Sequence, residues 1–120
     1  MKFVVILTIL MSFSSFAGDV ANGEKLWNSK KLNCAQCHGK KGEGKAATAD
    51  KIRAMKAPKI AGCDEKYIAE QLKAIGTKAR KTKYTAMMMS RVKKLSAKEY
   101  ADLAAYVSKM GPAHKCMYQK

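Results

Sequence analysis

Residues 34–38 read Cys34-Ala35-Gln36-Cys37-His38, and the rest of the chain is interpreted from them. Two cysteines separated by two residues and followed directly by histidine are typical of covalent haem c attachment. Each thiol can add to one vinyl group of the porphyrin, and the two-residue gap matches the distance between neighbouring vinyls. His38 then lies beneath the iron as an axial ligand. The pattern therefore predicts one haem c, held covalently by Cys34 and Cys37.

Two other interpretations of this cysteine pair are a thioredoxin-like redox dithiol and half of a zinc site. A zinc site would need a second Cys/His pair at ligand spacing, but the remaining cysteines, Cys63 and Cys116, stand alone. A thioredoxin-like motif would need a strand–helix–strand setting, and the sequence has no strand pattern. The haem interpretation is therefore favoured.

The first 17 residues have the features of a secretory signal. Lys2 gives a positive start, segment 3–11 is almost entirely apolar, and small residues around Ala17 suit a signal peptidase. The alternative is a retained membrane anchor, but this run is shorter than the roughly 20 residues that span a bilayer. We therefore expect removal of residues 1–17 and export of one domain, residues 18–120, to the periplasm, where disulfides are permitted.

The chain is strongly basic, with 24 Lys+Arg against 9 Asp+Glu. Lysines gather near the cysteine motif and a later methionine run, namely Lys40, Lys41, Lys45, Lys81, Lys83, Lys93 and Lys94. Most are expected to form an ordinary solvated surface. Around a redox centre they would also speed encounter with an acidic partner protein. Nucleic acid is a poor candidate for an exported chain without a recognition motif, whereas loose attraction to an anionic membrane is compatible with the charge.

Helical patterns cover most of the segment after the signal. A first helix is expected over 19–33, where Gly23 and Trp27 share a face and the glycine indicates close approach of another helix. A short helix is expected over 46–55. A further helix over 64–75 has an acidic start and an apolar stripe, and a capping box, Ser96-Ala97-Lys98-Glu99, begins the last one. The expected fold class is all-α.

The methionine run Ala86-Met87-Met88-Met89 is the second informative stretch. Three consecutive methionines cannot share one helix face, so they do not form a core stripe. A haem iron bound by one histidine has either a second axial ligand or an open position. A thioether is the usual second ligand in an electron carrier because it raises the reduction potential.

These motifs together resemble a small class I bacterial cytochrome c, similar to the cytochrome c-553 type and to one half of a cytochrome c4. In that family an N-terminal helix with a Gly-x-x-x-aromatic pattern crosses a C-terminal helix with Leu-x-x-Tyr-Val. The matching residues here are Gly23, Trp27, Leu103, Tyr106 and Val107. The resemblance covers nearly all of residues 18–120 and implies a cytochrome c fold, with roughly three to five helices around one haem c.

The resemblance also implies roles for residues around the haem. The family's Pro-x-Leu/Ile-x-Gly segment appears as residues 58–62, so the Pro58 carbonyl would accept the proton on the far nitrogen of His38 and orient the ring. The family's axial methionine lies seven residues before a Leu-Ser helix start, which selects Met88, with Met87 and Met89 as alternatives. Arg80 matches a basic position that would pair with a haem propionate or remain solvated.

Cys63 and Cys116 depart from the family pattern. In an oxidising compartment we expect them to form a disulfide that pins the C-terminal tail. The cysteines lie 53 positions apart, so such a bond would stabilise the fold by roughly 4 kcal/mol. Alternatives are a buried free thiol or a bond from Cys116 to another subunit. His114 has no motif support and is expected at the surface.

The function expected from the resemblance is periplasmic one-electron transfer by a monomer with acidic donor and acceptor proteins. No pocket with acid and base residues can be recognised, so a carrier is favoured over an enzyme. One alternative is a haem subunit that serves as a fixed relay in a larger periplasmic oxidoreductase, for example in sulfur-compound oxidation. The other is a haem enzyme or gas sensor in which no methionine binds the iron.

Overall fold

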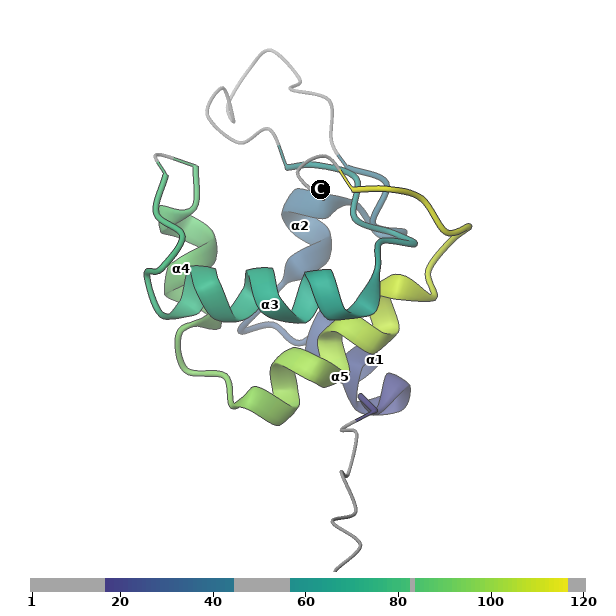
Figure 1. Ribbon diagram of the computed structural model, residues 1–120, viewed down its shortest axis with the longest axis horizontal. Coiled ribbons are helices and arrows are strands. Elements are labelled where there is room, and N and C mark those ends of the chain that lie inside the picture. Colours follow the sequence, from purple (N-terminus) through teal and green to yellow (C-terminus); the bar gives the residue numbers. More distant parts are fainter. Residues whose placement is uncertain (1–16, 45–56, 83, 117–120) are drawn as a thin grey trace, which may run out of the picture.

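The structure is a computed structural model and describes residues 17–44, 57–82 and 84–116. These residues form five helices and no strand, which confirms the all-α prediction (Figure 1). The helices are α1 (Val20–Asn28), α2 (Cys34–His38), α3 (Glu65–Gly76), α4 (Ala86–Val92) and α5 (Ala97–Ser108). None of these helices is long and apolar enough to cross a membrane. The helix expected over 46–55 and nearly all of the expected signal peptide lie outside the described residues.

Helices α1 and α5 cross at a glycine, as the family pattern predicts. Gly23 of α1 lies directly on the backbone of α5, where a β-carbon would overlap the carbonyl of Asp102. One turn later the Trp27 and Tyr106 rings pack with centroids 6.1 Å apart. The glycine therefore lets the two helix axes approach closely, and the aromatic pair fills the space beside the crossing.

A buried carboxylate fastens the start of α1 to α5. Asp102 is 1% exposed and accepts hydrogen bonds from the Asp19 backbone N–H at 2.7 Å and the Asn22 amide at 2.7 Å. Lys98, one turn earlier on α5, reaches the same carboxylate at 2.6 Å. Burial by itself raises the pKa of Asp102, but these three donors outweigh it and hold the pKa below its usual value.

Helix α3 packs on α5 and encloses the main apolar core. Its stripe is buried as the sequence predicts, at Ile68, Leu72 and Ile75. Tyr100 of α5 is buried as well, and its hydroxyl donates to the Val92 carbonyl at the end of α4, at 2.8 Å. The same carbonyl also accepts from the Leu95 N–H at 3.1 Å, so both bonds lie at the end of α4. Helix α4 is thus tied to the α3–α5 layer.

The end of the first helix differs from the sequence expectation, and the structure also contains a helix that was not expected. The first helix ends at Asn28 and does not continue to residue 33, because Ser29 adopts an extended conformation and its hydroxyl donates to the Leu26 carbonyl. A serine side chain that bonds the nearby backbone competes with helix continuation in this way. Helix α4 was not expected over the methionine run.

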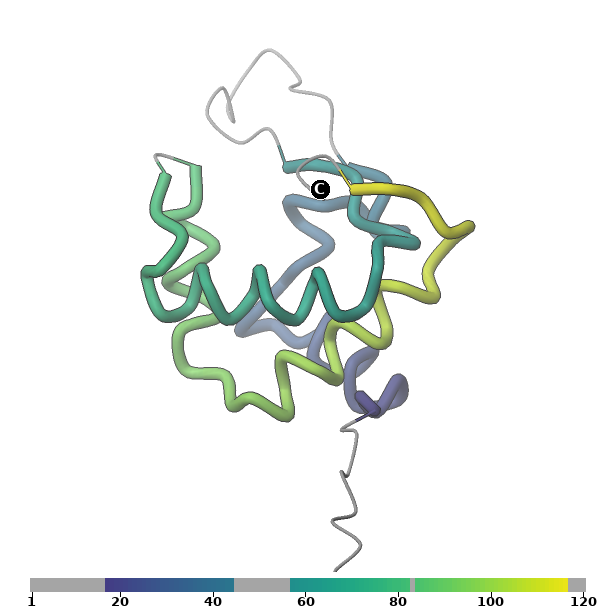
Figure 2. Tube along the Cα trace, in the orientation of Figure 1, coloured from purple at the N-terminus to yellow at the C-terminus, as the bar shows by residue number. Residues whose placement is uncertain are grey.

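The C-terminal tail returns to the loop that precedes α3, and Figure 2 shows the two segments side by side. The His114 N–H donates to the Gly62 carbonyl at 3.1 Å, and the Gly62 N–H donates to the Val107 carbonyl at 3.0 Å. Cys63 and Cys116 form a disulfide across this contact, with Cα atoms 5.5 Å apart. His114, expected at the surface, is half-buried in this contact.

Candidate functional site

The cysteine motif occupies a single short helix, α2. Asn33, in the left-handed conformation with φ 44°, turns the chain into it, and Gly39, with φ 86°, ends it. A helix places residues four apart on the same side, so Cys34 and His38 lie on one side of α2. The helix therefore gathers two thiols and an imidazole within two turns.

His38 is held by a hydrogen bond from its ring. The side chain is 9% exposed, and Nδ1 lies 3.1 Å from the Pro58 carbonyl oxygen. A carbonyl only accepts, so Nδ1 carries the proton and Nε2 keeps the lone pair that a metal needs. Burial lowers the pKa of His38, although the bond to Pro58 partly opposes this effect. The arrangement favours a neutral, oriented imidazole.

Backbone contacts between two loops bring Pro58 to this position. The Gly42 carbonyl accepts from the backbone N–H groups of Ile60 and Ala61, at 2.9 and 3.0 Å. The Gly44 N–H donates to the carbonyl of His38 itself at 2.7 Å. Gly42 and Gly44 both have positive φ, which glycine adopts at no steric cost. The glycine-rich loop after the motif thus holds the proline loop against the histidine.

The two motif cysteines are half-buried thiols in the structure. Burial raises the pKa of the Cys34 thiol to about 11, even though the backbone and Arg91 act in the opposite direction. A reactive redox dithiol needs a thiol whose pKa is lowered, because the thiolate is the nucleophile. This environment does not favour a thioredoxin-like role, and it is compatible with thiols that end as thioethers.

The three methionines differ in their surroundings on α4. Met87 is 50% exposed, whereas Met88 and Met89 are half-buried and pack against the core. The last two lie on the side of α4 that carries buried Thr85 and Val92, three to four residues away. The burial pattern sets Met87 apart as the exposed methionine of the three.

An arginine that the sequence analysis did not single out links α4 to the cysteine motif. Arg91 donates to the Leu32 carbonyl at 3.0 Å and to the Gln36 side chain at 3.4 Å. Its position two residues after the methionine run is the only sequence signal that would have drawn attention to it. Arg80 donates to Gln71 on α3 at 2.8 Å. Its pairing with a haem propionate stays a prediction.

The residues around His38 also fit a large apolar cofactor. The Trp27 ring lies 6.5 Å from the His38 ring, and its Nε1 is buried without a hydrogen-bond partner in the described part of the chain. Buried donors are normally satisfied, so this indole indicates that a group completes the pocket. Two thiols and a neutral imidazole are the donor set for haem c.

Comparison with known proteins decides the family. The cytochrome c family model matches residues 20–111. The chain belongs to the cytochrome c family. It therefore binds haem c covalently and transfers electrons, as the motif and the resemblance predicted.

Two relatives add detail to this assignment. The cytochrome is 34% identical over 92 residues to cytochrome c-554(548) of Halomonas halodenitrificans, covering 77% of this chain and 96% of that protein. It is 36% identical over 83 residues to the thiosulfate dehydrogenase electron acceptor of Thiomonas intermedia, covering 69% of this chain. The matched part spans 34% of the length of that second protein. The name of the Thiomonas protein describes it as an electron acceptor of thiosulfate dehydrogenase.

Proposed function

We propose that this cytochrome is a periplasmic one-electron carrier, and not an enzyme, with His38 and Met88 as axial ligands. The observation that carries the proposal is the buried His38, whose Nδ1 proton is fixed by Pro58 while Nε2 is left to donate. The signal-like residues 1–17 support export and a mature chain that begins near Gly18. Donor and acceptor are proposed to be acidic proteins that meet the cytochrome as a monomer.

Haem c supplies the redox chemistry, since its iron is stable in both the ferric and the ferrous states. The residues of the chain limit how much the site rearranges. Pro58 holds the His38 ring in one orientation, which makes it a better donor. Arg91 ties the end of α4 to the residues before and within α2, and thereby fixes the proposed methionine ligand relative to the histidine. A ligand set that does not move favours rapid electron transfer.

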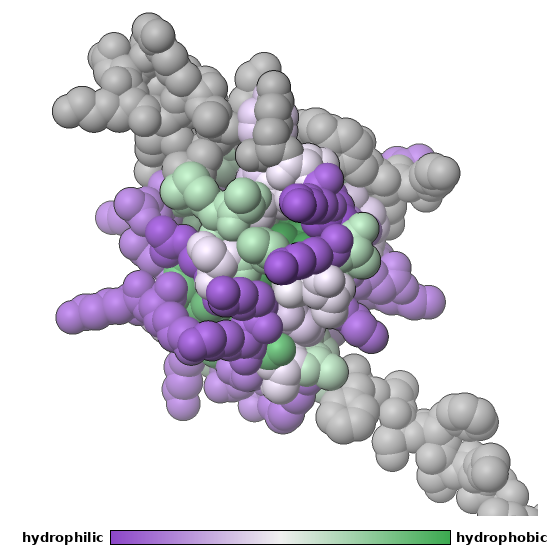
Figure 3. All heavy atoms as spheres, turned by 90° about the vertical axis from the view of Figure 1, so that its left-hand side faces the viewer, coloured by the Kyte–Doolittle hydropathy of each residue, from purple (hydrophilic) through white to green (hydrophobic). Residues whose placement is uncertain are grey.

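The proposed docking surface lies on the face of the molecule that carries α4. Figure 3 shows this face, where apolar side chains are exposed among hydrophilic ones. Tyr84 and Met87 are the large apolar residues exposed in the described chain, at 48% and 50%. Exposed lysines near them in the sequence include Lys81, Lys93 and Lys94. An acidic partner would be steered by these charges and contact the apolar centre.

A fixed relay within a larger oxidoreductase is a second candidate. The relative named as the electron acceptor of thiosulfate dehydrogenase favours it, and makes an oxidoreductase of sulfur compounds a candidate donor. The two roles differ in one observable property. A carrier purifies alone, whereas a relay subunit purifies with its partner from the native periplasm.

Carbon monoxide tests the proposed ligands, because it binds a ferrous haem only where an axial position is open. We expect no spectral change on adding it to the reduced holoprotein. Met88→Ala should open the site and give a carbon monoxide adduct, whereas the exposed Met87→Ala should not. If Met89→Ala gives a carbon monoxide adduct and Met88→Ala does not, the axial ligand is Met89 and not Met88. An adduct in the unmodified protein would contradict the carrier proposal and favour an enzyme or sensor.

A further inference from the structure

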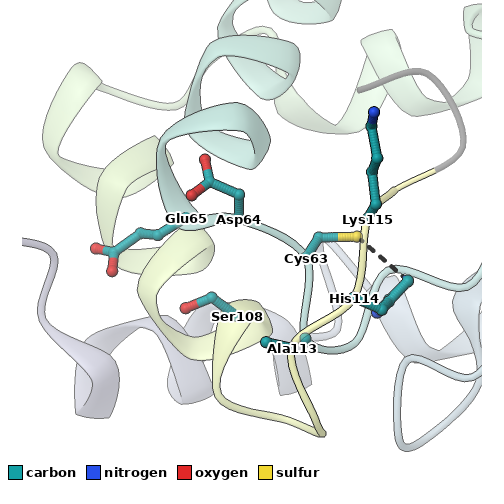
Figure 4. Close-up of a pocket in the computed structure, with 8 residues that line it drawn as sticks. Cys63, Asp64, Glu65, Ser108, Ala113, His114 and Lys115 are labelled. Atoms are coloured by element: carbon teal, nitrogen blue, oxygen red, sulfur yellow. Dashed lines mark hydrogen bonds between the residues drawn. The ribbon is translucent and has the colours of Figure 1, made fainter. Parts of the chain in front are cut away.

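The C-terminal tail and the loop before α3 together carry a cluster of sulfur and imidazole ligands outside the haem motif. Among the described residues, Cys63, His114 and Cys116 bring one ligand atom each to within 4.8 Å of one another. His114 Nε2 lies 3.8 Å from the Cys63 sulfur, and Figure 4 shows the imidazole turned toward that cysteine. Electron transfer at the haem leaves this cluster without a role.

We propose that the Cys63–Cys116 disulfide, when reduced, becomes a binding site for a thiophilic metal ion with His114 as the third ligand. In a tetrahedral zinc site, ligand bonds of about 2.3 Å to sulfur and about 2.0 Å to nitrogen put sulfur and nitrogen about 3.5 Å apart. The observed 3.8 Å between Cys63 Sγ and His114 Nε2 is already close to this spacing. The two sulfurs must separate, because a disulfide holds them closer than two ligands of one metal ion.

The backbone holds His114 beside Cys63 without the disulfide, and Cys116 follows two residues later. The His114 N–H bonds the Gly62 carbonyl at 3.1 Å, next to Cys63, and the Cys63 N–H bonds the Ile60 carbonyl at 3.1 Å. A β-carbon on Gly62 would overlap the Pro112 carbonyl, so the tail lies directly on this loop. The ligands therefore stay near one another after the sulfur–sulfur bond is broken.

The environment of His114 supports a ligand role. Its Nδ1 is buried and has no hydrogen-bond partner in the described chain, so the ring's polar contact is with sulfur. The Lys115 side chain extends away from the sulfur, and the carboxylates of Asp64 and Glu65 point away as well (Figure 4). Two sulfurs and one nitrogen select zinc or cuprous copper over calcium or magnesium, which prefer oxygen ligands.

A metal ion has a way in and room for a fourth ligand. An open surface hollow of about 570 Å³ lies beside the cluster, lined by residues that include Cys63, Ser108, Ala113 and His114. Water from this hollow can complete a tetrahedral site.

The chemistry balances with a dithiol as reductant. A thiolate of the reductant attacks one sulfur of the disulfide and releases the other as a thiolate, which takes up a proton. The second thiol of the reductant then displaces the attacked sulfur from the mixed disulfide, and the reductant leaves as its own cyclic disulfide. The cytochrome gains two electrons and two protons as two thiols. A divalent ion then replaces both thiol protons and binds the neutral imidazole, so two protons are released.

Zinc binding to the holoprotein tests the proposal. The protein is reduced with a water-soluble phosphine, which becomes the phosphine oxide as water supplies the oxygen, and is then dialysed anaerobically against zinc. Elemental analysis gives zinc per haem iron, and calorimetry gives the affinity. In the holoprotein Cys34 and Cys37 are thioethers and do not compete. We expect about one zinc per iron after reduction and almost none before it.

Variants assign the site to its ligands. His114→Ala should weaken zinc binding by roughly tenfold or more, while Lys115→Ala should still bind about one zinc per iron. The double variant Cys63→Ser, Cys116→Ser should bind none, and reduced protein with alkylated thiols gives the same control if that variant does not accumulate. Reduced protein that binds no more zinc than these controls would overturn the site. Unchanged affinity in His114→Ala would overturn the role of the histidine.

Discussion

Gly23 in α1 lies against the backbone carbonyl of Asp102 in α5, with no room between them for a single β-carbon. The contact joins residues 79 positions apart (102 − 23). The Asp102 side chain bonds the first turn of α1 from the same place. One residue of α5 thus supports α1 through its carbonyl, where the helices cross, and through its carboxylate, where α1 begins.

Gly23→Ala should destabilise the fold, because the new methyl group forces α1 and α5 apart. We expect the free energy of unfolding to fall by about 2 kcal/mol, measured by denaturant titration of the holoprotein. Gly111→Ala is the matched control, since a β-carbon there would lie 3.7 Å from its nearest neighbour, an ordinary contact. Equal stabilities of the two variants would contradict the close crossing.

Acid should weaken the fold partly through Asp102. Its pKa is below its usual value in the folded chain, so the unfolded chain binds the proton more readily. The stabilisation is fully present above about pH 5 and is lost as the pH falls through the folded pKa. Asp102→Asn should lower the melting temperature at pH 7. The difference in melting temperature between the variant and the parent should become smaller below about pH 4. A difference in melting temperature that stays constant from pH 7 to pH 3 would show that the Asp102 carboxylate does not contribute to the loss of stability in acid.

Arg91→Gln should loosen α4 from the cysteine motif. The variant loses the bond to the Leu32 carbonyl, at a cost of about 1–2 kcal/mol. If α4 carries the axial methionine, the charge-transfer band of methionine-ligated ferric haem should weaken at a lower denaturant concentration than in the parent. Lys93→Gln removes the same charge from an exposed neighbour and should leave that concentration unchanged.

The mature holoprotein should contain no thiol that reacts under denaturing, non-reducing conditions. Cys34 and Cys37 are consumed by the haem, and Cys63 is joined to Cys116. Replacing the latter pair by serine should lower the free energy of unfolding by about 4 kcal/mol, since the bond closes a long loop. Two reactive thiols per molecule in the denatured holoprotein would show that the pair is not joined in solution.

The local signals in the sequence were sufficient for the cofactor and for most helices. Covalent chemistry fixes the spacing of Cys34, Cys37 and His38, so five residues carry the haem prediction. Local hydrogen bonds and periodic burial mark α3 and α5. The Ser96–Glu99 capping box is present in the structure as predicted. The boundary error after Asn28 arose because the Ser29 side chain bonds the preceding turn, which periodicity does not reveal.

Only the tertiary structure decided which distant residues meet. Asp102 accepts a hydrogen bond from Asp19 at the start of α1, Arg91 reaches the Leu32 carbonyl, and His114 comes to lie beside the Cys63–Cys116 disulfide. No local pattern encodes these contacts, because each joins residues that are far apart in the sequence. The shortest separation is that between Cys63 and His114, which are 51 positions apart (114 − 63). Such contacts depend on how the helices pack. The sequence by itself determined the haem chemistry, because covalent attachment to the porphyrin sets the spacing of the two cysteines and the histidine. Helix packing decided the hydrogen bonds that hold the ligands in place.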